Sequence, residues 1–243
     1  MKPNEQLLRD HFRTFDTTID EFNKTLARLL PSSSAVVAYI SAMDGFGTRH
    51  SDVDVYAVGS SSARENQRID LGDLELDVEL WPESRLVAAA SYCRSMHRSC
   101  DPEQFDFEAL KAIYRVVTGV RISGSSDCTY GLTPSILADG FKLWYGMESV
   151  AFYNDSAGLL EAGDLLGALI TARRAFEAAG AALCCSDRRP ILNIKWLPRA
   201  LSEHLDLYQT FSRVETHLQP SEATIEEILW TSNQWLLLAG YGS

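Results

Sequence analysis

Two short apolar runs separated by a turn of small residues restrict the fold of this chain most strongly. The first run is Ala35–Ile40, and the second lies within an expected strand Asp52–Val58. Runs this short and rich in β-branched residues are typical of buried strands. The sequence therefore predicts two strands close together, joined by Ser41–His50 as a turn with room for one helical turn.

Two carboxylates stand where the second strand begins. Asp52 and Asp54 are two residues apart, so their side chains project from the same face of a strand. Acids held ~7 Å apart along one strand repel each other and usually share a cation. A solvated acidic loop is the simplest alternative, and a calcium loop is excluded because Tyr56 and Ala57 stand where its third ligand and glycine are required. The pair predicts a divalent-metal site for phosphate chemistry.

The stretch between Ile69 and Trp81 predicts a third strand and shows the clearest alternation of apolar and acidic residues in the chain. Its apolar face consists of Leu74, Leu76, Val78 and Leu80, and its acidic face consists of Glu75, Asp77 and Glu79. The short connection to the preceding strand predicts antiparallel pairing, which would bring the acidic face beside Asp52 and Asp54.

Helical patterns surround these strands. Apolar residues recur at three- and four-residue steps over residues 3–29, which predicts one amphipathic helix there. Further helices are expected at 83–98 and 103–118, and a polar, glycine-bearing break follows at 123–134. Only helices are expected beyond it, at 135–154, 157–184, 197–216 and 221–239, with the alanine-rich second one central. The predicted organisation is an α+β domain over residues 1–125 and a helical domain over 126–243.

Composition limits the classes of partner. The formal net charge is −11 over 243 residues and no basic cluster is present, so nucleic acid is not expected as the main ligand and a cationic partner is favoured. No apolar run is long enough to cross a bilayer, and the N-terminal MKPNEQLLRDHF has no signal-peptide core, so a cytoplasmic protein without membrane contact is expected. Reduced thiols are expected because no CxxC spacing occurs among Cys93, Cys100, Cys128, Cys184 and Cys185.

The spacing of the turn and the acid pair resembles that of a known family. Ser41 is followed by nine residues and then by Ser51-Asp52-Val53-Asp54. This pattern resembles the nucleotidyltransferase superfamily related to DNA polymerase β, which has a Gly-Ser pair, a short spacer, Ser-Asp-x-Asp and a third carboxylate on a later strand. Ile40 stands where the family usually has glycine. The resemblance implies an N-terminal nucleotidyltransferase domain with a mixed sheet and helices.

The resemblance also implies roles for individual residues. Asp52 and Asp54 would ligate two Mg²⁺ ions, and Asp77 would complete the metal site on the acceptor side or act as general base. Glu79 is a rival for this third position and Glu75 a weaker one, and an exposed strand face is the alternative for all of them. A catalytic set of Asp52, Asp54 and Asp77 is therefore expected.

Two further residues of the turn are candidates for nucleotide binding. Ser41 would offer its hydroxyl and backbone N–H to a phosphate, although an ordinary helix cap would use the same groups. Arg49 is a candidate phosphate contact, and a solvated loop arginine is the alternative.

The helical half shows a second resemblance. Arg173–Glu177 followed by Asn193–Arg199, with the segment Lys195-Trp196-Leu197, is similar to the nucleotidyltransferases that inactivate aminoglycoside or lincosamide antibiotics. In those enzymes a lysine of the helical domain contacts the triphosphate, so Lys195 is the candidate here. A surface lysine with no ligand is the alternative.

Together these features predict an Mg²⁺-dependent nucleotidyltransferase that moves a nucleotidyl group, AMP from ATP, onto a hydroxyl of a small molecule and releases pyrophosphate. Resistance and biosynthetic acceptors both remain open. A nucleotidyltransferase that modifies a protein or RNA is one alternative, and a catalytically degenerate nucleotide-binding or toxin-neutralising module is another. A homodimer is compatible with the sequence, which does not fix the oligomeric state.

Overall fold

The computed structural model describes residues 3–30, 33–48, 51–59, 64–95, 105–124, 128–186, 190–216 and 219–241. Contacts between residues divide the chain into two compact units, Met1–Pro134 and Ser135–Ser243. The sequence had placed a domain boundary between residues 125 and 126, within a segment, 125–127, that lies outside the described residues.

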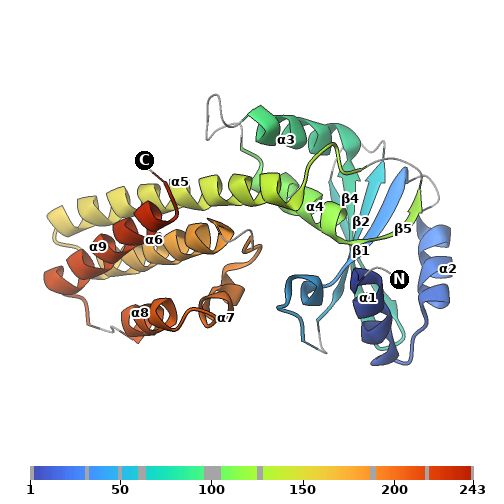
Figure 1. The fold of residues 1–243 in the computed structure, drawn as a ribbon, viewed down its shortest axis with the longest axis horizontal. Helices are drawn as coiled ribbons and strands as arrows, with labels where there is room; N and C mark the ends of the chain where they lie inside the picture. The colour runs from blue at the N-terminus through green and yellow to red at the C-terminus, as the bar shows by residue number, and fades with distance from the viewer. Residues whose placement is uncertain are drawn as a thin grey trace. The chain divides into compact units, whose positions relative to one another are not determined.

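A five-stranded mixed sheet forms the centre of the first unit, with the strand order β3-β4-β2-β1-β5 (Figure 1). The strands are β1 (Ala35–Tyr39), β2 (Val53–Gly59), β3 (Glu65–Leu71), β4 (Leu74–Pro82) and β5 (Val120–Gly124). β2 and β4 are parallel, and the other neighbouring strands are antiparallel. The predicted α+β class with a mixed sheet is confirmed.

The expected single strand at 69–81 is wrong, because two strands meet there in a hairpin. Gly72 has a φ of 65°, a conformation that glycine adopts without strain, and the chain reverses at this point to join β3 to β4. β3 therefore occupies the antiparallel position beside β4, and β2 pairs with β4 in parallel. The antiparallel pairing that we expected between the second strand and the acidic strand is wrong, although the two strands are neighbours.

The short strand β5 is not among the predicted elements, because residues 120–122 fall between the expected helix 103–118 and the polar break 123–134. Val120–Gly124 pairs antiparallel with β1 and completes one edge of the sheet. Val120 and Ile122 alternate with polar residues and pack against the core, but five residues give too short a pattern to identify from sequence.

Two helices replace the single helix expected at 3–29, namely α1 (Pro3–Arg13) and α2 (Ile19–Leu29). Thr18 starts the second helix with a capping box: its hydroxyl accepts from the Glu21 N–H at 3.2 Å, and its own N–H donates to the Glu21 carboxylate at 3.1 Å. Asp16 has a φ of 51°, which a helix cannot accommodate. The capping residues therefore override the continuous apolar periodicity.

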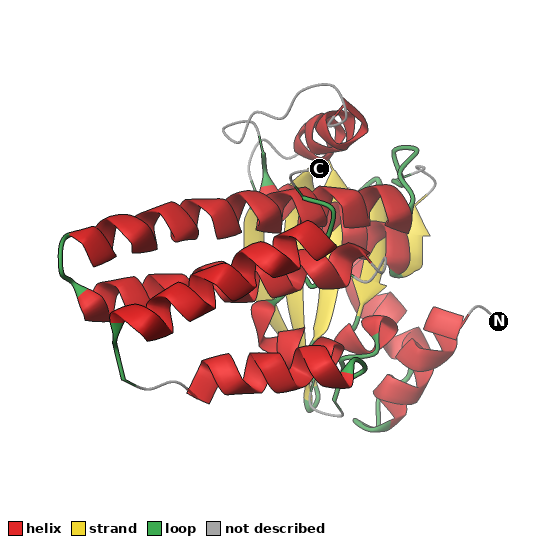
Figure 2. Cartoon of the chain, turned by 60° about the vertical axis from the view of Figure 1, so that its left-hand side comes forward, coloured by secondary structure: helices red, strands yellow, loops and turns green. Residues whose placement is uncertain are grey.

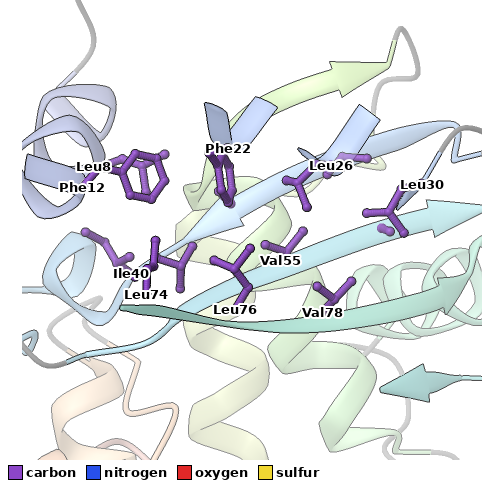
Figure 3. Packing of buried hydrophobic residues seen from close by; sticks show 14 residues of the cluster. Leu8, Phe12, Phe22, Leu26, Leu30, Ile40, Val55, Leu74, Leu76 and Val78 are labelled. Atoms are coloured by element: carbon purple, nitrogen blue, oxygen red, sulfur yellow. The ribbon is translucent and has the colours of Figure 1, made fainter. Parts of the chain in front are cut away.

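One face of the sheet is covered by α1 and α2 through the main apolar core (Figure 3). The helices contribute Leu8, Phe12, Phe22 and Leu26, and the sheet contributes Ile40, Val53, Val55, Ala57, Leu74, Leu76 and Val78 among others. The expected apolar face of β4 is thus confirmed. The opposite face, which bears the acidic residues, packs against α3 (Glu83–Ser95) and α4 (Phe107–Thr118).

The second unit contains only helices in its described residues, as predicted (Figure 2). They are α5 (Pro134–Glu161), α6 (Leu165–Ser186), α7 (Leu197–Leu201), α8 (Leu205–Thr216), α9 (Glu222–Leu238) and the 3₁₀ turn η3 (Ile194–Trp196). α6 packs against α9, and it is tied to α5 by hydrogen bonds of 2.8 Å from the Ser149 hydroxyl to the Ala175 carbonyl and from the Ser156 hydroxyl to the Ala168 carbonyl.

Two helix boundaries in this unit differ from prediction. The expected break near residue 155 is absent, and α5 runs on to Glu161 because the Ser156 hydroxyl is satisfied inside the bundle. The chain instead turns at Gly163, whose φ is 79°. The expected helix 197–216 is two helices, α7 and α8, separated at residues 202–204.

Other sequence expectations concern the whole chain. Within its described parts, the structure contains no helix with the length and apolar character needed to cross a membrane. The four described cysteines, Cys93, Cys128, Cys184 and Cys185, are buried free thiols.

We expect the core beneath α2 to provide much of the stability of the first unit. Leu26 is 1% exposed and Leu29 on the same helix is 43% exposed. Leu26→Ala should lower the free energy of unfolding by about 2–5 kcal/mol, whereas Leu29→Ala should change it by about 0.5 kcal/mol or less. Urea denaturation followed by circular dichroism measures both, and equal effects of the two substitutions would contradict this packing.

Candidate active site

The predicted acids meet on the face of the sheet opposite the main core. In the parallel pairing of β2 with β4, Asp54 lies opposite Asp77 and Tyr56 lies opposite Glu79. Neighbouring strands are about 4.8 Å apart, so these side chains are direct neighbours. Asp52 is exposed at the residue before β2. The structure thus brings Asp52, Asp54 and Asp77 to one end of one sheet face.

The turn before β2 begins with the 3₁₀ helix η1 (Ser41–Asp44). Ile40 precedes it with an ordinary extended backbone (φ −133°, ψ 146°), and its side chain is buried in the core beneath α1. Glycine is required instead at Gly45, where φ is 82°, and at Gly47, where a Cβ atom would lie 2.4 Å from the backbone nitrogen of Ala42. Ile40 therefore adopts its backbone conformation without strain, and its side chain faces away from the acids.

Ser41 is half-buried at the start of η1, and its hydroxyl makes no hydrogen bond to any residue that the structure describes. The turn closes on the acid pair through Thr48 and Ser51: the Thr48 N–H donates to the Ser51 hydroxyl at 2.9 Å, and the Ser51 N–H donates to the Thr48 carbonyl at 3.1 Å. The Ser41 hydroxyl is thus available to a ligand. Arg49 lies outside the described residues, and its phosphate contact stays a prediction.

A buried arginine from α4 faces the acids. Nη1 of Arg115 lies 3.9 Å from Oδ1 of Asp54 and 4.0 Å from Oε1 of Glu79, and it donates a hydrogen bond to the Tyr56 hydroxyl. The guanidinium carbon is 5.3 Å from the centre of the Tyr39 ring and 5.6 Å from that of Tyr56, so both rings add cation–π attraction. The side chain of Arg115 is only 18% exposed. It supplies a fixed positive charge to this face.

The electrostatic environment of Asp54 reflects this crowding. Burial raises its pKa to about 6, and the nearby charges of Asp52, Glu79 and Asp77 act in the same direction. The positive charge of Arg115 opposes the shift. The raised pKa means that the protein alone stabilises the negative charge of this carboxylate poorly, and a nearby cation would stabilise it.

The structure separates the two rivals for the third carboxylate. Both oxygens of Glu79 have partners: Oε2 is 2.9 Å from Nη2 of Arg64 and accepts from Nε1 of Trp81 at 2.9 Å, and Oε1 accepts from the Tyr56 hydroxyl at 3.3 Å. Glu79 is thus part of a structural network, which favours Asp77 as the third acid.

Asp77 has a more replaceable partner. Its Oδ1 accepts from Nε of Arg68 at 3.2 Å, and the same nitrogen lies 2.9 Å from Oε1 of Glu75. Arg68 is 69% exposed, and exposed ion pairs of this kind contribute little to stability. A polar pocket of about 310 Å³ opens beside Asp77, lined by Asn66, Gln67, Arg68, Asp77, Val78 and Glu79. A ligand can therefore reach Asp77 with little loss of protein contacts.

The donor set fits a magnesium ion that completes its coordination with substrate. Across the described ranges, no group of three histidine, cysteine or acidic side chains is close enough to hold one metal ion. Mg²⁺ is commonly bound by one or two carboxylates, several waters and the phosphates of a nucleotide. Asp52 and Asp54 supply such a pair of hard oxygen ligands from one strand, with Asp77 beside them.

Sequence reasoning missed four polar residues around the acids: Tyr39, Asp44, Tyr56 and Arg115. Arg115 belongs to a helix that was noticed for its apolar stripe, and the tyrosines were assigned to strands. Asp44 lies inside the turn itself, where its carboxylate accepts hydrogen bonds from the hydroxyls of Tyr39 and Tyr114. Alternation along the predicted strand Asp52–Val58 places Tyr56 on the same face as Asp52 and Asp54. Only tertiary structure brings Tyr39, Asp44 and Arg115 to this face, so no local pattern indicates those three.

Lys195 lies in the second unit, within η3, and is exposed. Its Nζ is 5.2 Å from the centre of the Trp196 ring, and its N–H donates to the Asn193 side chain at 3.1 Å. An exposed ammonium at a structured turn is suited to an anionic ligand. The assignment of Lys195 to the triphosphate stays a prediction.

Comparison with known proteins identifies the fold. No protein-family model matches this chain, and no sequence among the curated proteins matches it either. A solved structure of a nucleotidyltransferase-like protein from Exiguobacterium sibiricum 255-15 superposes with a TM-score of 0.51 at 15% sequence identity, covering 96% of this chain and 77% of that one. The chain therefore has a nucleotidyltransferase-like fold.

We expect Glu79 to matter for stability and Asp77 for ligand binding. Glu79→Ala removes charged hydrogen bonds to Arg64 and Trp81 and should lower the free energy of unfolding by about 1.5–3 kcal/mol. Asp77→Ala should leave the unfolding midpoint nearly unchanged. Urea titrations of both variants test this division of roles, which a larger loss for Asp77→Ala would overturn.

Proposed function

We propose that this chain is an Mg²⁺-dependent nucleotidyltransferase that moves a nucleotidyl group, AMP from ATP, onto a hydroxyl of a small molecule. The observation that carries the proposal is the parallel register of β2 and β4, which sets Asp54 opposite Asp77 with Asp52 at the start of the strand. The nucleotidyltransferase-like fold and the available Ser41 hydroxyl support the same reading.

The proposed reaction requires an oriented acceptor and a stabilised leaving group. The acceptor hydroxyl oxygen forms a bond to the α-phosphorus, and the bond from that phosphorus to the bridging oxygen of pyrophosphate breaks. The hydroxyl proton passes to the carboxylate of Asp77, whose place beside the polar pocket suits a general base. Bound Mg²⁺ would neutralise charge on the phosphates and lower the pKa of the attacking hydroxyl.

Other residues of the chain would bind the nucleotide. Asp52 and Asp54 would hold the metal–phosphate complex, and Ser41 would donate its hydroxyl to a phosphate oxygen. Lys195, from the second unit, would contribute a positive charge to the triphosphate.

The class of acceptor is proposed from charge. The net charge of −11 disfavours RNA and favours a neutral or cationic acceptor. Two acids, Asp77 and Glu79, also line the polar pocket on the sheet face that carries Asp54. An aminoglycoside-like or lincosamide-like natural product satisfies these demands, and so does a polyhydroxylated biosynthetic intermediate. We propose no membrane partner.

A nucleotide-binding protein without transferase activity is the second candidate. The observation that favours it is that the acids of the described chain are engaged by Arg115, Arg64 and Arg68 and do not converge on one metal position. Pyrophosphate release in the presence of acceptor separates the two candidates, because a binding module would release none.

Asp54→Asn tests the catalytic assignment with almost no change in shape. Pyrophosphate release from ATP, measured with a panel of hydroxylated acceptors, should fall at least about 100-fold because the amide is a poor ligand for Mg²⁺. Asp70→Asn on the exposed edge strand β3 is the matched control and should retain wild-type rates. Retention of activity by Asp54→Asn would rule out metal-dependent transfer at this face.

Lys195→Ala tests the contribution of the second unit. Loss of a charged contact to phosphate should raise the KM for ATP by about 10- to 100-fold with a smaller effect on kcat. Lys24→Ala removes the same charge from an exposed position of α2, on the opposite side of the sheet, and should leave both constants unchanged. An unchanged KM in Lys195→Ala would remove this residue from the site.

A further inference from the structure

The carboxylate of Asp44 bonds the η1 turn to two other elements of the first unit, in addition to the apolar contacts of Ala42 and Met43 with the main core. Asp44 ends the turn, and the Tyr114 hydroxyl donates to its Oδ1 at 3.0 Å while the Tyr39 hydroxyl donates to its Oδ2. Tyr39 belongs to β1 and Tyr114 to α4. We call Tyr39, Asp44 and Tyr114 the Asp44 clamp, because the three side chains join a strand, a turn and a helix.

The backbone of the turn is short and needs such support. Its hydrogen bonds run from the N–H of Met43 to the carbonyl of Ile40 (2.9 Å), from Gly45 to Ala42 (3.0 Å) and from Phe46 to Ser41 (3.1 Å). A single 3₁₀ turn is not stable in isolation, because fixing its dihedral angles costs more than a few such bonds return. Tertiary contacts therefore determine the orientation of the turn.

Aspartate is well suited to this position. A carboxylate offers two acceptor oxygens at a fixed separation, and each oxygen here is bonded to a different element of the fold. Burial raises the pKa of Asp44, and both tyrosine hydroxyls oppose that shift by donating to the charged form. The side chain of Asp44 is half-buried.

The clamp also borders the acid face, by which we mean the sheet face that carries Asp54, Asp77 and Glu79. The Tyr39 ring that donates to Asp44 is the same ring that lies 5.3 Å from the Arg115 guanidinium, which in turn faces Asp54. Tyr39 thus contacts both Asp44 of the turn and the arginine that faces Asp54. A substitution that moves the turn is therefore expected to shift Arg115 relative to Asp54 as well.

We propose that Asp44 is a positioning residue that, with Tyr39 and Tyr114, holds the η1 turn in the orientation required to present Ser41 to the phosphates of a nucleoside triphosphate. This inference rests on the proposed function and deepens it, because it places part of the nucleotide affinity in a group that does not touch the nucleotide. The role is separate from metal binding, which belongs to Asp52 and Asp54.

The test compares Tyr114→Phe and Asp44→Ala with a matched control, Ser156→Ala. The Ser156 hydroxyl donates to the Ala168 carbonyl at 2.8 Å in the second unit, so the control also removes one buried hydroxyl bond. Two quantities are measured: hydrogen exchange of the backbone amides of residues 41–47, and the dissociation constant for ATP with Mg²⁺.

In Tyr114→Phe, exchange in the turn should accelerate and the ATP dissociation constant should rise about 2- to 10-fold, with a larger change in Asp44→Ala. Ser156→Ala should alter neither quantity. Unchanged exchange in both clamp variants would overturn the proposal, and so would faster exchange with wild-type ATP affinity. Failure of the wild-type chain to bind ATP would contradict the proposed function itself, and the exchange comparison would still decide whether the clamp holds the turn.

Discussion

The parallel pairing of β2 with β4 is the constraint on which the candidate site depends. A one-residue slip in this register would turn every acidic side chain of one strand into the apolar core and every core residue toward solvent. The core of α1 and α2 against Val55, Leu76 and Val78 therefore fixes the position of Asp54 opposite Asp77 on the other face. Packing on the apolar side of the sheet therefore determines which acidic side chains are neighbours on the other side.

Arginines partly neutralise the negative charge of the acid face, and they differ in their exposure to solvent. Arg115 is largely shielded from solvent, lies close to the rings of Tyr39 and Tyr56, and is held beside Asp54. Arg68 is exposed and pairs with Asp77 through a contact that a ligand can replace at small cost. Asp77 is therefore easier for a ligand to reach than Asp54.

The sequence predicts the parts of this arrangement that follow from local patterns. Alternation in β4 identified the acidic face, and the spacing from Ser41 to Asp54 indicated the fold that comparison with a solved structure supports. The direction of the β2–β4 pairing was not predictable, because it depends on the reversal at Gly72 hidden within continuous alternation.

Tertiary contacts explain the remaining differences. Arg115 reaches the acids only when α4 packs on the sheet, and Asp44 acquires its role only when Tyr39 and Tyr114 meet it from two elements. The proposed binding of a metal–nucleotide complex by Asp52, Asp54 and Asp77 can be measured by anomalous diffraction from crystals grown with Mn²⁺ and a non-hydrolysable ATP analogue. We expect a manganese peak beside Asp52 and Asp54, with Asp77 released from Arg68. Bound nucleotide with no manganese at these carboxylates would rule the proposal out.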